Sequence, residues 1–314
     1  MGCTVTAVID SNSEESRKSL QELPNRFEEW EQALSRFRID SELSLLNRSN
    51  GKPFYASPTL WEVANLSLTA YELTGGLVTP TILNSLTAAG YHSDFSLIQN
   101  ETRDSERQLL PHIPSDFHSV DFDNETREII MPSGMQLDFG GIAKGWAAQK
   151  SADLLNRLGP VLVSVGGDIS ISSPPKNQDL WPIGIEDPFE NQNHYETIYV
   201  SDGGVATSGR DYRKWKYGNQ WVHHIIDPRV GLPALTDVLT ATIIAPSTVL
   251  AESAAKAVLI LGGAQGLDWL AQQHNNLAGL LILEDGSSMA TENFSNFFIK
   301  ESSRPQLLKD TKNE

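Results

Sequence analysis

Hydrophobic and polar residues alternate at two different spacings along this chain, and each spacing predicts its own kind of element. The segment "TVTAVID" at 4–10 alternates every second residue, which is typical of a strand. In "RFEEWEQALSRF" at 26–37 the large apolar residues recur every three or four positions, so this segment is predicted to be an amphipathic helix. Pro24 is predicted to mark its start, because proline suits a first helical turn.

Two further helices are predicted from the signals at their ends. Ser57 can cap a helix over "PTLWEVANLSLTAYELT", Pro58 suits its first turn, and the pair Gly75-Gly76 can end it. Ser247 can likewise cap the apolar, alanine-rich segment "TVLAESAAKAVLILG". Both helices are apolar enough to pack against a core.

Strands joined by turns are predicted through the centre of the chain. "SVDFDNETREIIM" indicates a hairpin around Asn124, and "VLVSVGGDISIS" indicates a buried strand that enters a Gly-Gly-Asp turn. "LDFGGIAKGWAAQKSADLLNRLG" predicts a strand end, a glycine pair and a helix that stops at Gly159. More strands follow from "WPIGIEDP" onward. Because no repeat or linker divides the chain, we expect one α+β domain over 1–300 and a polar tail at 301–314.

Composition narrows the classes of protein that this chain can belong to. A 39% hydrophobic and 20% charged composition is that of a globular domain, and no apolar run is long enough to span a bilayer. The net charge of −16 argues against a nucleic-acid partner. Cys3 is the single cysteine, which excludes an internal disulfide. No signal-peptide pattern is visible, and the localisation stays open.

Glycine-rich turns carry the first candidates for chemistry. In "LDFGGIAKGW", Asp138 precedes two glycines and Lys144 falls in the first turn of the next helix, where backbone N–H groups favour a phosphate. Asp168 of "SVGGDI" could bind a hydroxyl, a ring nitrogen or a cation, and "ATSGRDYRKW" joins Ser208 and Gly209 to basic residues. Each pattern is also compatible with an ordinary turn and surface ion pairs.

The segment "HHIIDPRVGLP" at 223–233 is the densest cluster of polar chemistry. Strand alternation would place His224 and Ile226 on one face, and His223 and Ile225 on the other. A lone histidine on a strand is most often structural, whereas the polar turns around this pair favour a functional role. The pattern by itself leaves both interpretations open.

Taken in order, these segments resemble the ApbE family, the FAD:protein FMN transferases. The resemblance runs from residue 1 to about residue 265 and rests on the following segments: "MGCTV", "LSRFRIDSELSLLN", "TGGLVTPT", "LDFGGIAKGWAAQ", "VSVGGDI", "GIEDP", "VATSGRDYRKW", "HHIIDPRVGLP" and "STVLAESAAKAVLILG". It implies a single T-fold-like α+β domain, with sheets and flanking helices. The implied activity is Mg²⁺-dependent transfer of FMN from FAD to a Ser or Thr of a partner flavoprotein, with release of AMP.

The resemblance also implies roles for individual residues. His224 matches the histidine implied in catalysis. Gly141, through its carbonyl, and Glu252 would hold the metal ion. The positions implied to bind FAD are Met1, Phe37, Thr79, Asp138, Lys144, Ser208, Gly209 and Ile226. The motif "MGC" at residue 1 further implies a segment that precedes it in related chains.

Three positions depart from the family pattern. Thr79 replaces an aspartate of the flavin motif, Glu252 replaces an aspartate of the metal motif, and Lys256 replaces a threonine. A lysine cannot bind a cation but could itself face a pyrophosphate. Two hypotheses follow for Lys256: it replaces the metal, or it pairs with Glu252 beside a shifted metal. The alternative function is an FAD-binding protein of the same fold with weak or no transfer. No acceptor motif is found in this chain, so the acceptor is expected to be another protein.

Overall fold

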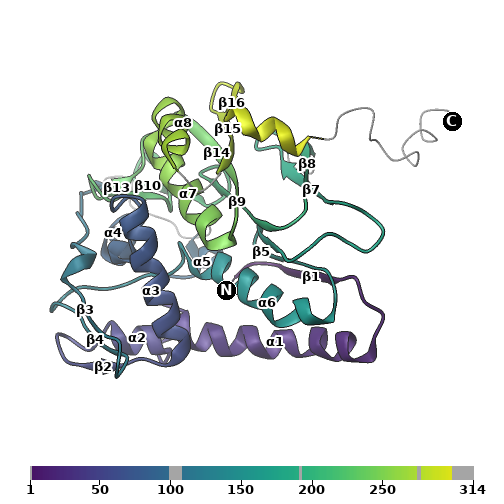
Figure 1. The fold of residues 1–314 in the computed structure, drawn as a ribbon. Helices are drawn as coiled ribbons and strands as arrows, with labels where there is room; N and C mark the ends of the chain where they lie inside the picture. The colour runs from purple at the N-terminus through teal and green to yellow at the C-terminus, as the bar shows by residue number, and fades with distance from the viewer. Residues whose placement is uncertain (1, 99–107, 191–192, 274–276, 299–314) are drawn as a thin grey trace.

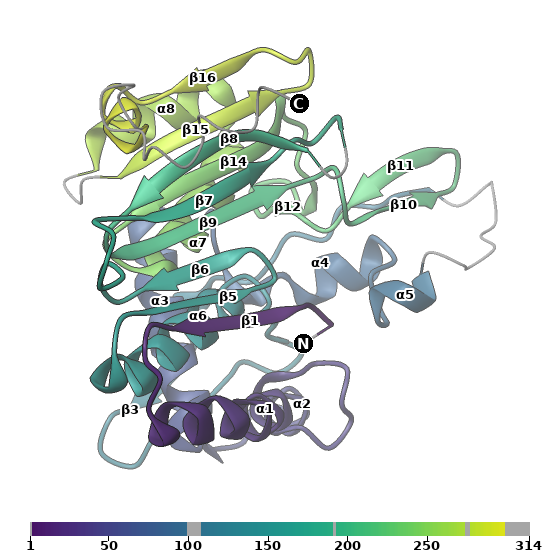
Figure 2. The ribbon, with the colours of Figure 1, turned by 90° about the vertical axis from the view of Figure 1, so that its right-hand side faces the viewer.

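A seven-stranded sheet forms the centre of the structure, which is a computed structural model that describes residues 2–98, 108–190, 193–273 and 277–298 (Figure 1). Neighbouring strands in it are antiparallel throughout. In spatial order, as Figure 2 shows, the strands are β1 (Val5–Ile9), β5 (Val161–Val165), β6 (Asp168–Ile171), β9 (Gly203–Gly209), β14 (Val238–Ala245), β15 (Ala278–Leu283) and β16 (Ser288–Ala290). Met1 and the predicted tail at 301–314 lie outside the described residues.

Both faces of this sheet are covered, because alternate residues of its strands are apolar on opposite sides. Ile243 and Ile244 are adjacent in β14, yet they belong to different hydrophobic clusters. Val205 and Ala206 of β9 divide in the same way. The α-helices pack on one face. The hairpin of β7 (Trp181–Glu186) and β8 (His194–Val200), together with η4 (Glu292–Phe297), packs on the other.

The helices α6, α7 and α8 cover one face of the sheet, and α1 adds a second layer at α6. α6 lies on β5 and β6, α7 lies on β9 and β14, and α1 packs under α6 (Figure 1). The helices of the described residues are α1 (Glu14–Leu34), α2 (Glu42–Leu46), α3 (Pro58–Leu73), α4 (Leu83–Ala88), α5 (Phe95–Ile98), α6 (Ala143–Leu155), α7 (Thr248–Leu261) and α8 (Gly263–Gln272), with short 3-10 turns η1 (Pro80–Ile82), η2 (Phe117–Ser119) and η3 (Asn156–Leu158).

Smaller sheets lie around this central unit. One contains three strands in the order β2 (Phe54–Tyr55), β4 (Glu128–Ile130) and β3 (Asp121–Asp123). Two others are pairs, β10 (Lys214–Tyr217) with β11 (Gln220–His223), and β12 (Ile226–Asp227) with β13 (Leu232–Pro233). No helix of the described residues is both long and apolar enough to cross a membrane.

The two predicted serine caps and the two predicted turns are confirmed. The Ser57 hydroxyl accepts from the Leu60 N–H at 3.2 Å and begins α3. The Ser247 hydroxyl accepts from the Leu250 N–H at 3.3 Å and begins α7. The glycine turn at 166–167 joins β5 to β6, and the hairpin around residue 124 is formed by β3 and β4. The α+β class is confirmed as well.

The prediction that Pro24 begins the first helix is wrong. α1 begins ten residues earlier, capped by Ser13, and contains Pro24. Pro24 is exposed, so water can reach the carbonyl that loses its hydrogen bond, while Leu23 and Trp30 on the buried side hold the helix in place. The helix ends at Leu34, before the predicted residue 37.

The predicted strand end at 137–138 is also wrong, because other groups bind this backbone. The Asn47 side chain donates to the Leu137 carbonyl at 2.9 Å and accepts from the Leu137 N–H at 2.7 Å. The Asp138 N–H donates to the Pro80 carbonyl at 2.7 Å. These bonds satisfy the backbone in an extended segment that is not part of any sheet.

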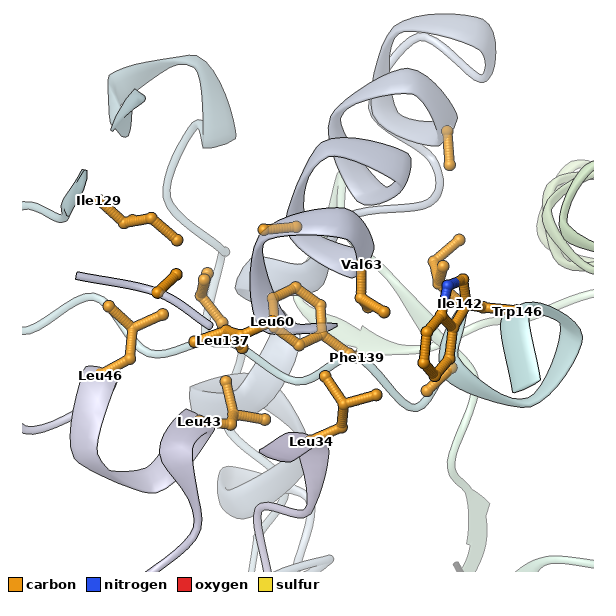
Figure 3. Packing of buried hydrophobic residues seen from close by; sticks show 14 of the residues in the cluster. Leu34, Leu43, Leu46, Leu60, Val63, Ile129, Leu137, Phe139, Ile142 and Trp146 are labelled. Carbon is orange, nitrogen blue, oxygen red and sulfur yellow. The ribbon is translucent and has the colours of Figure 1, made fainter. Parts of the chain in front are cut away.

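The core beneath this segment fixes the chain before α6. Leu34, Leu43 and Leu60 pack around Phe139 from α1, α2 and α3, and Ile142 and Trp146 continue the cluster along α6 (Figure 3). Leu43 and Leu60 are fully buried. The glycine pair between Phe139 and Ile142 is thereby held at a fixed place above a rigid base.

We expect Leu43→Ala to lower the free energy of unfolding by about 2–5 kcal/mol, because it leaves a cavity beside Phe139. Leu45→Ala on the same helix is the matched control, since Leu45 is 48% exposed, and should cost less than about 1 kcal/mol. Urea unfolding of both variants measures the difference. Equal losses would contradict the role assigned to this core.

Candidate functional site

Four charged side chains from three elements meet at one end of the sheet, and we call them the charge cluster: Lys144, Asp168, Glu252 and Lys256. The Lys144 ammonium contacts Asp168 Oδ2 and lies 3.1 Å from Glu252 Oε1. Lys256 Nζ lies 2.9 Å from the same oxygen. All four side chains are largely buried, so each charge is compensated by its neighbours rather than by water.

Glu252 also caps the N-terminus of α6 from a different helix. Ile142 at the N-cap gives no side-chain hydrogen bond, and Glu252 Oε2 from α7 instead accepts the Gly145 N–H at 2.8 Å. The positive end of the α6 dipole favours this carboxylate. A Cβ at Gly145 would stand 2.8 Å from that oxygen and 3.0 Å from the Thr248 carbonyl, so only glycine lets α6 and α7 come this close.

The pKa values in the charge cluster follow from burial and from these contacts. Burial raises the pKa of Glu252, but the two lysines outweigh it and lower that pKa to about 2. Burial lowers the pKa of Lys144, and Asp168 and Glu252 outweigh it, so the pKa rises above its ordinary value. Glu252 and Lys144 are therefore both ionised at neutral pH.

A second group joins Asp138 to an arginine. Asp138 Oδ2 lies 2.6 Å from Arg36 Nε, and Asp138 Oδ1 accepts the Gly140 N–H at 2.6 Å. The Arg36 guanidinium lies 4.3 Å from the ring of Phe37 and 4.6 Å from that of Tyr91. Arg36 Nη2 is buried and has no hydrogen-bond partner within the described part of the chain. It is free to donate to a ligand.

His224 lies next to this group. Its ring packs edge-on against Tyr91 at 6.5 Å, and Ile226 joins the same cluster of side chains as Tyr91. Its Nδ1 is buried and also lacks a partner among the residues described. Burial and then the positive charge of Arg213 hold the pKa of His224 well below its ordinary value, and Lys256 and Lys144 act in the same direction. The imidazole is therefore neutral at physiological pH.

His223 has a structural role on the opposite face. Its Nε2 is 3.1 Å from the Ala234 carbonyl, and its Nδ1 accepts the Ile225 N–H at 3.3 Å. Ile225 and Ala234 share one hydrophobic cluster, whereas Ile226 belongs to another. The predicted alternation is therefore confirmed, and of the two histidines only His224 has a nitrogen left for a ligand.

The remaining predicted residues lie in different surroundings. Thr79 is buried, and its hydroxyl lies 2.7 Å from that of Thr81, so it is engaged within its own turn. Ser208 and Gly209 lie on β9 beyond its last pairing with β6, at the end of the sheet that carries the turn before Asp168. Ser208 is buried and, by strand alternation, faces the helices.

The structure thus brings most of the predicted residues into two adjoining groups. Lys144 and Glu252 lie in the charge cluster, and Gly141 lies against it. Phe37, Asp138 and His224 surround Tyr91, which links them. Sequence reasoning missed Arg36 and Tyr91. The first stands next to Phe37 in "SRF" and could have been noticed, whereas only folding brings Tyr91 to the site.

Comparison with known proteins shows the family to which this chain belongs. A family model described as the ApbE family matches residues 1–281. The chain belongs to the ApbE family. Among related proteins, it is 30% identical over 279 residues to the FAD:protein FMN transferase of Treponema pallidum, covering 83% of this chain and 76% of that protein. It is 28% identical over 294 residues to that of Vibrio cholerae, covering 90% and 86%.

Solved ApbE structures have the same fold. The ApbE protein from Thermotoga maritima matches with a TM-score of 0.83 and 24% identity, over 95% of this chain and 97% of its own. The flavin transferase ApbE from Vibrio cholerae matches with a TM-score of 0.76 and 23% identity, over 95% and 96%. The single-domain α+β architecture is therefore that of the family.

A flavin nucleotide fits the groups left open at this site. Arg36 Nη2 can donate and His224 Nδ1 can donate or accept, and both are buried where a ligand would satisfy them. A Cβ at Gly167 would meet nothing within 4 Å, so the turn beside the charge cluster is open to an approaching ligand. Phe37 is 45% exposed and offers a ring face.

A divalent cation bound by Glu252 does not fit the same residues. Glu252 Oε1 already contacts two ammonium groups, and Oε2 accepts the Gly145 N–H. A divalent cation about 4 Å from one ammonium would meet a repulsion on the order of 8 kcal/mol at an effective dielectric of ~20. Among the described residues, no group of three His, Cys, Asp or Glu side chains is placed to hold a metal.

The buried state of His223 predicts a loss of stability in acid. Burial lowers its pKa from 6.5 to about 4, so between these values the unfolded chain takes up a proton that the folded chain does not. The contribution of His223 to the free energy of unfolding is complete above about pH 6.5 and falls as the pH drops. At about pH 5 it is lower by about 2 kcal/mol. Between about pH 7.5 and about pH 5, the free energy of unfolding measured in urea should fall by about 2 kcal/mol less in His223→Gln than in the wild type.

His118→Gln is the control for this comparison, because His118 is exposed. That variant should follow the wild-type pH dependence. An equal pH dependence in the wild type and His223→Gln would contradict the assignment of His223 as a buried neutral imidazole.

Proposed function

We propose that this protein is an FAD:protein FMN transferase, which moves the FMN part of FAD onto a Ser or Thr hydroxyl of a partner flavoprotein and releases AMP. The observation that carries the proposal is His224, a buried imidazole whose Nδ1 has no partner among the described residues and whose pKa is lowered by burial and by the positive charges of Arg213, Lys256 and Lys144. The names of the related ApbE proteins support the same activity.

The reaction needs a proton acceptor and positive charge. The acceptor hydroxyl oxygen forms a bond to the FMN phosphorus, the anhydride P–O bond breaks, and AMP leaves with the bridging oxygen and its electron pair. The hydroxyl proton passes to a base, for which we assign the neutral His224 imidazole. Phosphoryl transfer depends mostly on positioning and on electrostatic stabilisation of the phosphate charge, which the surrounding cations provide.

The two groups of residues suit the two ends of the reacting part of FAD. Phe37 and Tyr91 offer aromatic surface, and Arg36 offers an unpaired donor, for the flavin end. The first turn of α6 and its lysine, Lys144, suit the phosphates. Asp138 holds Arg36 against these rings through its 2.6 Å contact.

Acceptor transfer tests the proposal directly. Purified protein is incubated with FAD and a separate acceptor domain that carries a Ser/Thr flavinylation motif, once with Mg²⁺ and once with EDTA. We expect a fluorescent acceptor band on a denaturing gel. Mg²⁺ dependence, which the family resemblance implies, is read from the two conditions. Protein that binds FAD but gives no band in either condition would support the alternative, an FAD-binding protein without transfer.

His224→Gln should slow transfer by about 100-fold or more, because it removes the proton acceptor. The affinity for FAD, measured by flavin fluorescence, should change little, so the loss falls on the rate of the chemical step. His118→Gln is the control and should transfer at the wild-type rate. A His224→Gln variant with unchanged transfer would exclude the imidazole as the base.

A further inference from the structure

Lys256 contacts Glu252 and passes near Gly141, the two residues that the family resemblance assigns to a metal ion. Its Nζ lies 2.9 Å from Glu252 Oε1. Its side chain passes so close to Gly141 that an added Cβ there would lie 3.4 Å from Lys256 Cε. A positive charge belonging to the protein is therefore already present at Glu252, on a side chain that passes near Gly141.

The net charge of the charge cluster becomes negative when this lysine is removed. With all four side chains ionised, Lys144 and Lys256 contribute +2, and Asp168 and Glu252 contribute −2, so the cluster is neutral. Without Lys256 the sum is +1 − 2 = −1, and one oxygen of a buried carboxylate loses a partner. Only in that state does the cluster attract an additional cation.

Lys256 also acts toward His224. It belongs, with Arg213 and Lys144, to the positive charges that act on the imidazole, whose Nδ1 is buried and unpartnered among the described residues. An anionic group that lies beside this imidazole enters a region of positive potential to which Lys256 contributes. A phosphate is the ligand that this combination of groups favours.

We propose that Lys256 takes the place of a divalent cation in this protein, so that its ammonium supports a phosphate of the bound dinucleotide and FAD binds without any metal ion. The inference rests on the proposed function in one respect, namely that FAD is the dinucleotide. The competing explanation is that Lys256 forms only an i,i+4 ion pair that stabilises α7. That role requires no ligand and predicts no change in FAD affinity.

Binding of Mn²⁺ alone, followed by electron paramagnetic resonance, tests the site without FAD. The wild type should bind no Mn²⁺ at the site. Lys256→Thr should bind one Mn²⁺, because the cluster then has a net negative charge and Glu252 Oε1 keeps only one ammonium partner, Lys144. Lys256→Met should bind none, since methionine fills the space and its sulfur is a poor ligand for a hard cation. Mn²⁺ binding by the wild type would overturn the proposal.

FAD affinity, measured by flavin fluorescence in EDTA and in Mg²⁺, tests the ligand. Wild-type affinity should be the same in both conditions. In EDTA, Lys256→Thr and Lys256→Met should each bind FAD about tenfold more weakly or worse. Mg²⁺ should restore affinity to Lys256→Thr but not to Lys256→Met. Wild-type binding that EDTA weakens, or wild-type affinity in both variants, would overturn the proposal.

Lys150→Thr is the matched control, because Lys150 pairs with Glu62 at 2.8 Å on a half-exposed surface of α6. It should bind FAD as the wild type does. If Lys256→Thr does not fold, Lys256→Met decides the result in EDTA.

Metal-independent FAD binding without any labelled acceptor would contradict the proposed transferase function and leave this inference standing. Acceptor labelling that needs Mg²⁺ would leave the function standing and remove this inference.

Discussion

The buried carboxylate of Glu252 is the constraint on which the rest of this structure depends. An isolated charge at that depth is costly, so it must have partners, and they come from separate elements. Gly145 and Lys144 bind it from α6, and Lys256 binds it from its own helix. Asp168 shares Lys144 and ties the turn between β5 and β6 to the same point. Two helices and the end of the sheet are thereby fixed together.

The pairing of these carboxylates with lysines also decides the chemistry that this end of the sheet can perform. The carboxylates are paired with lysines, and two buried polar atoms without a partner in the described part of the chain lie beside the charge cluster. These are Arg36 Nη2 and His224 Nδ1. Both adjoin Tyr91, and burial, followed by the positive charge around His224, lowers the pKa of its imidazole and keeps it neutral. Positive charge beside a neutral base is an arrangement suited to a phosphate under attack by a hydroxyl.

Sequence patterns predicted those features of the fold that short stretches of chain decide. The serine caps at 57 and 247 and the glycine turn at 166–167 depend on neighbours within three residues. The prediction that Pro24 begins a helix is wrong, because Leu23 and Trp30 hold the helix around it from the buried side. Their packing outweighs the one hydrogen bond that the proline removes. The strand end predicted before α6 is wrong, because the backbone there binds the side chain of Asn47. No local pattern indicates that partner, which is 90 residues away in sequence.

By itself, the sequence determined the family, the α+β class, and the residue types available for chemistry, since these follow from motifs and local spacing. It also raised the two hypotheses for Lys256 without deciding between them. Only the tertiary structure showed that two ammonium groups meet one oxygen of Glu252. It also showed that His224, unlike His223, has a buried nitrogen without a partner in the described part of the chain. The physical reason is that the net charge and the hydrogen-bond partners of a buried group are set by side chains from distant segments, which only folding brings within a few ångströms.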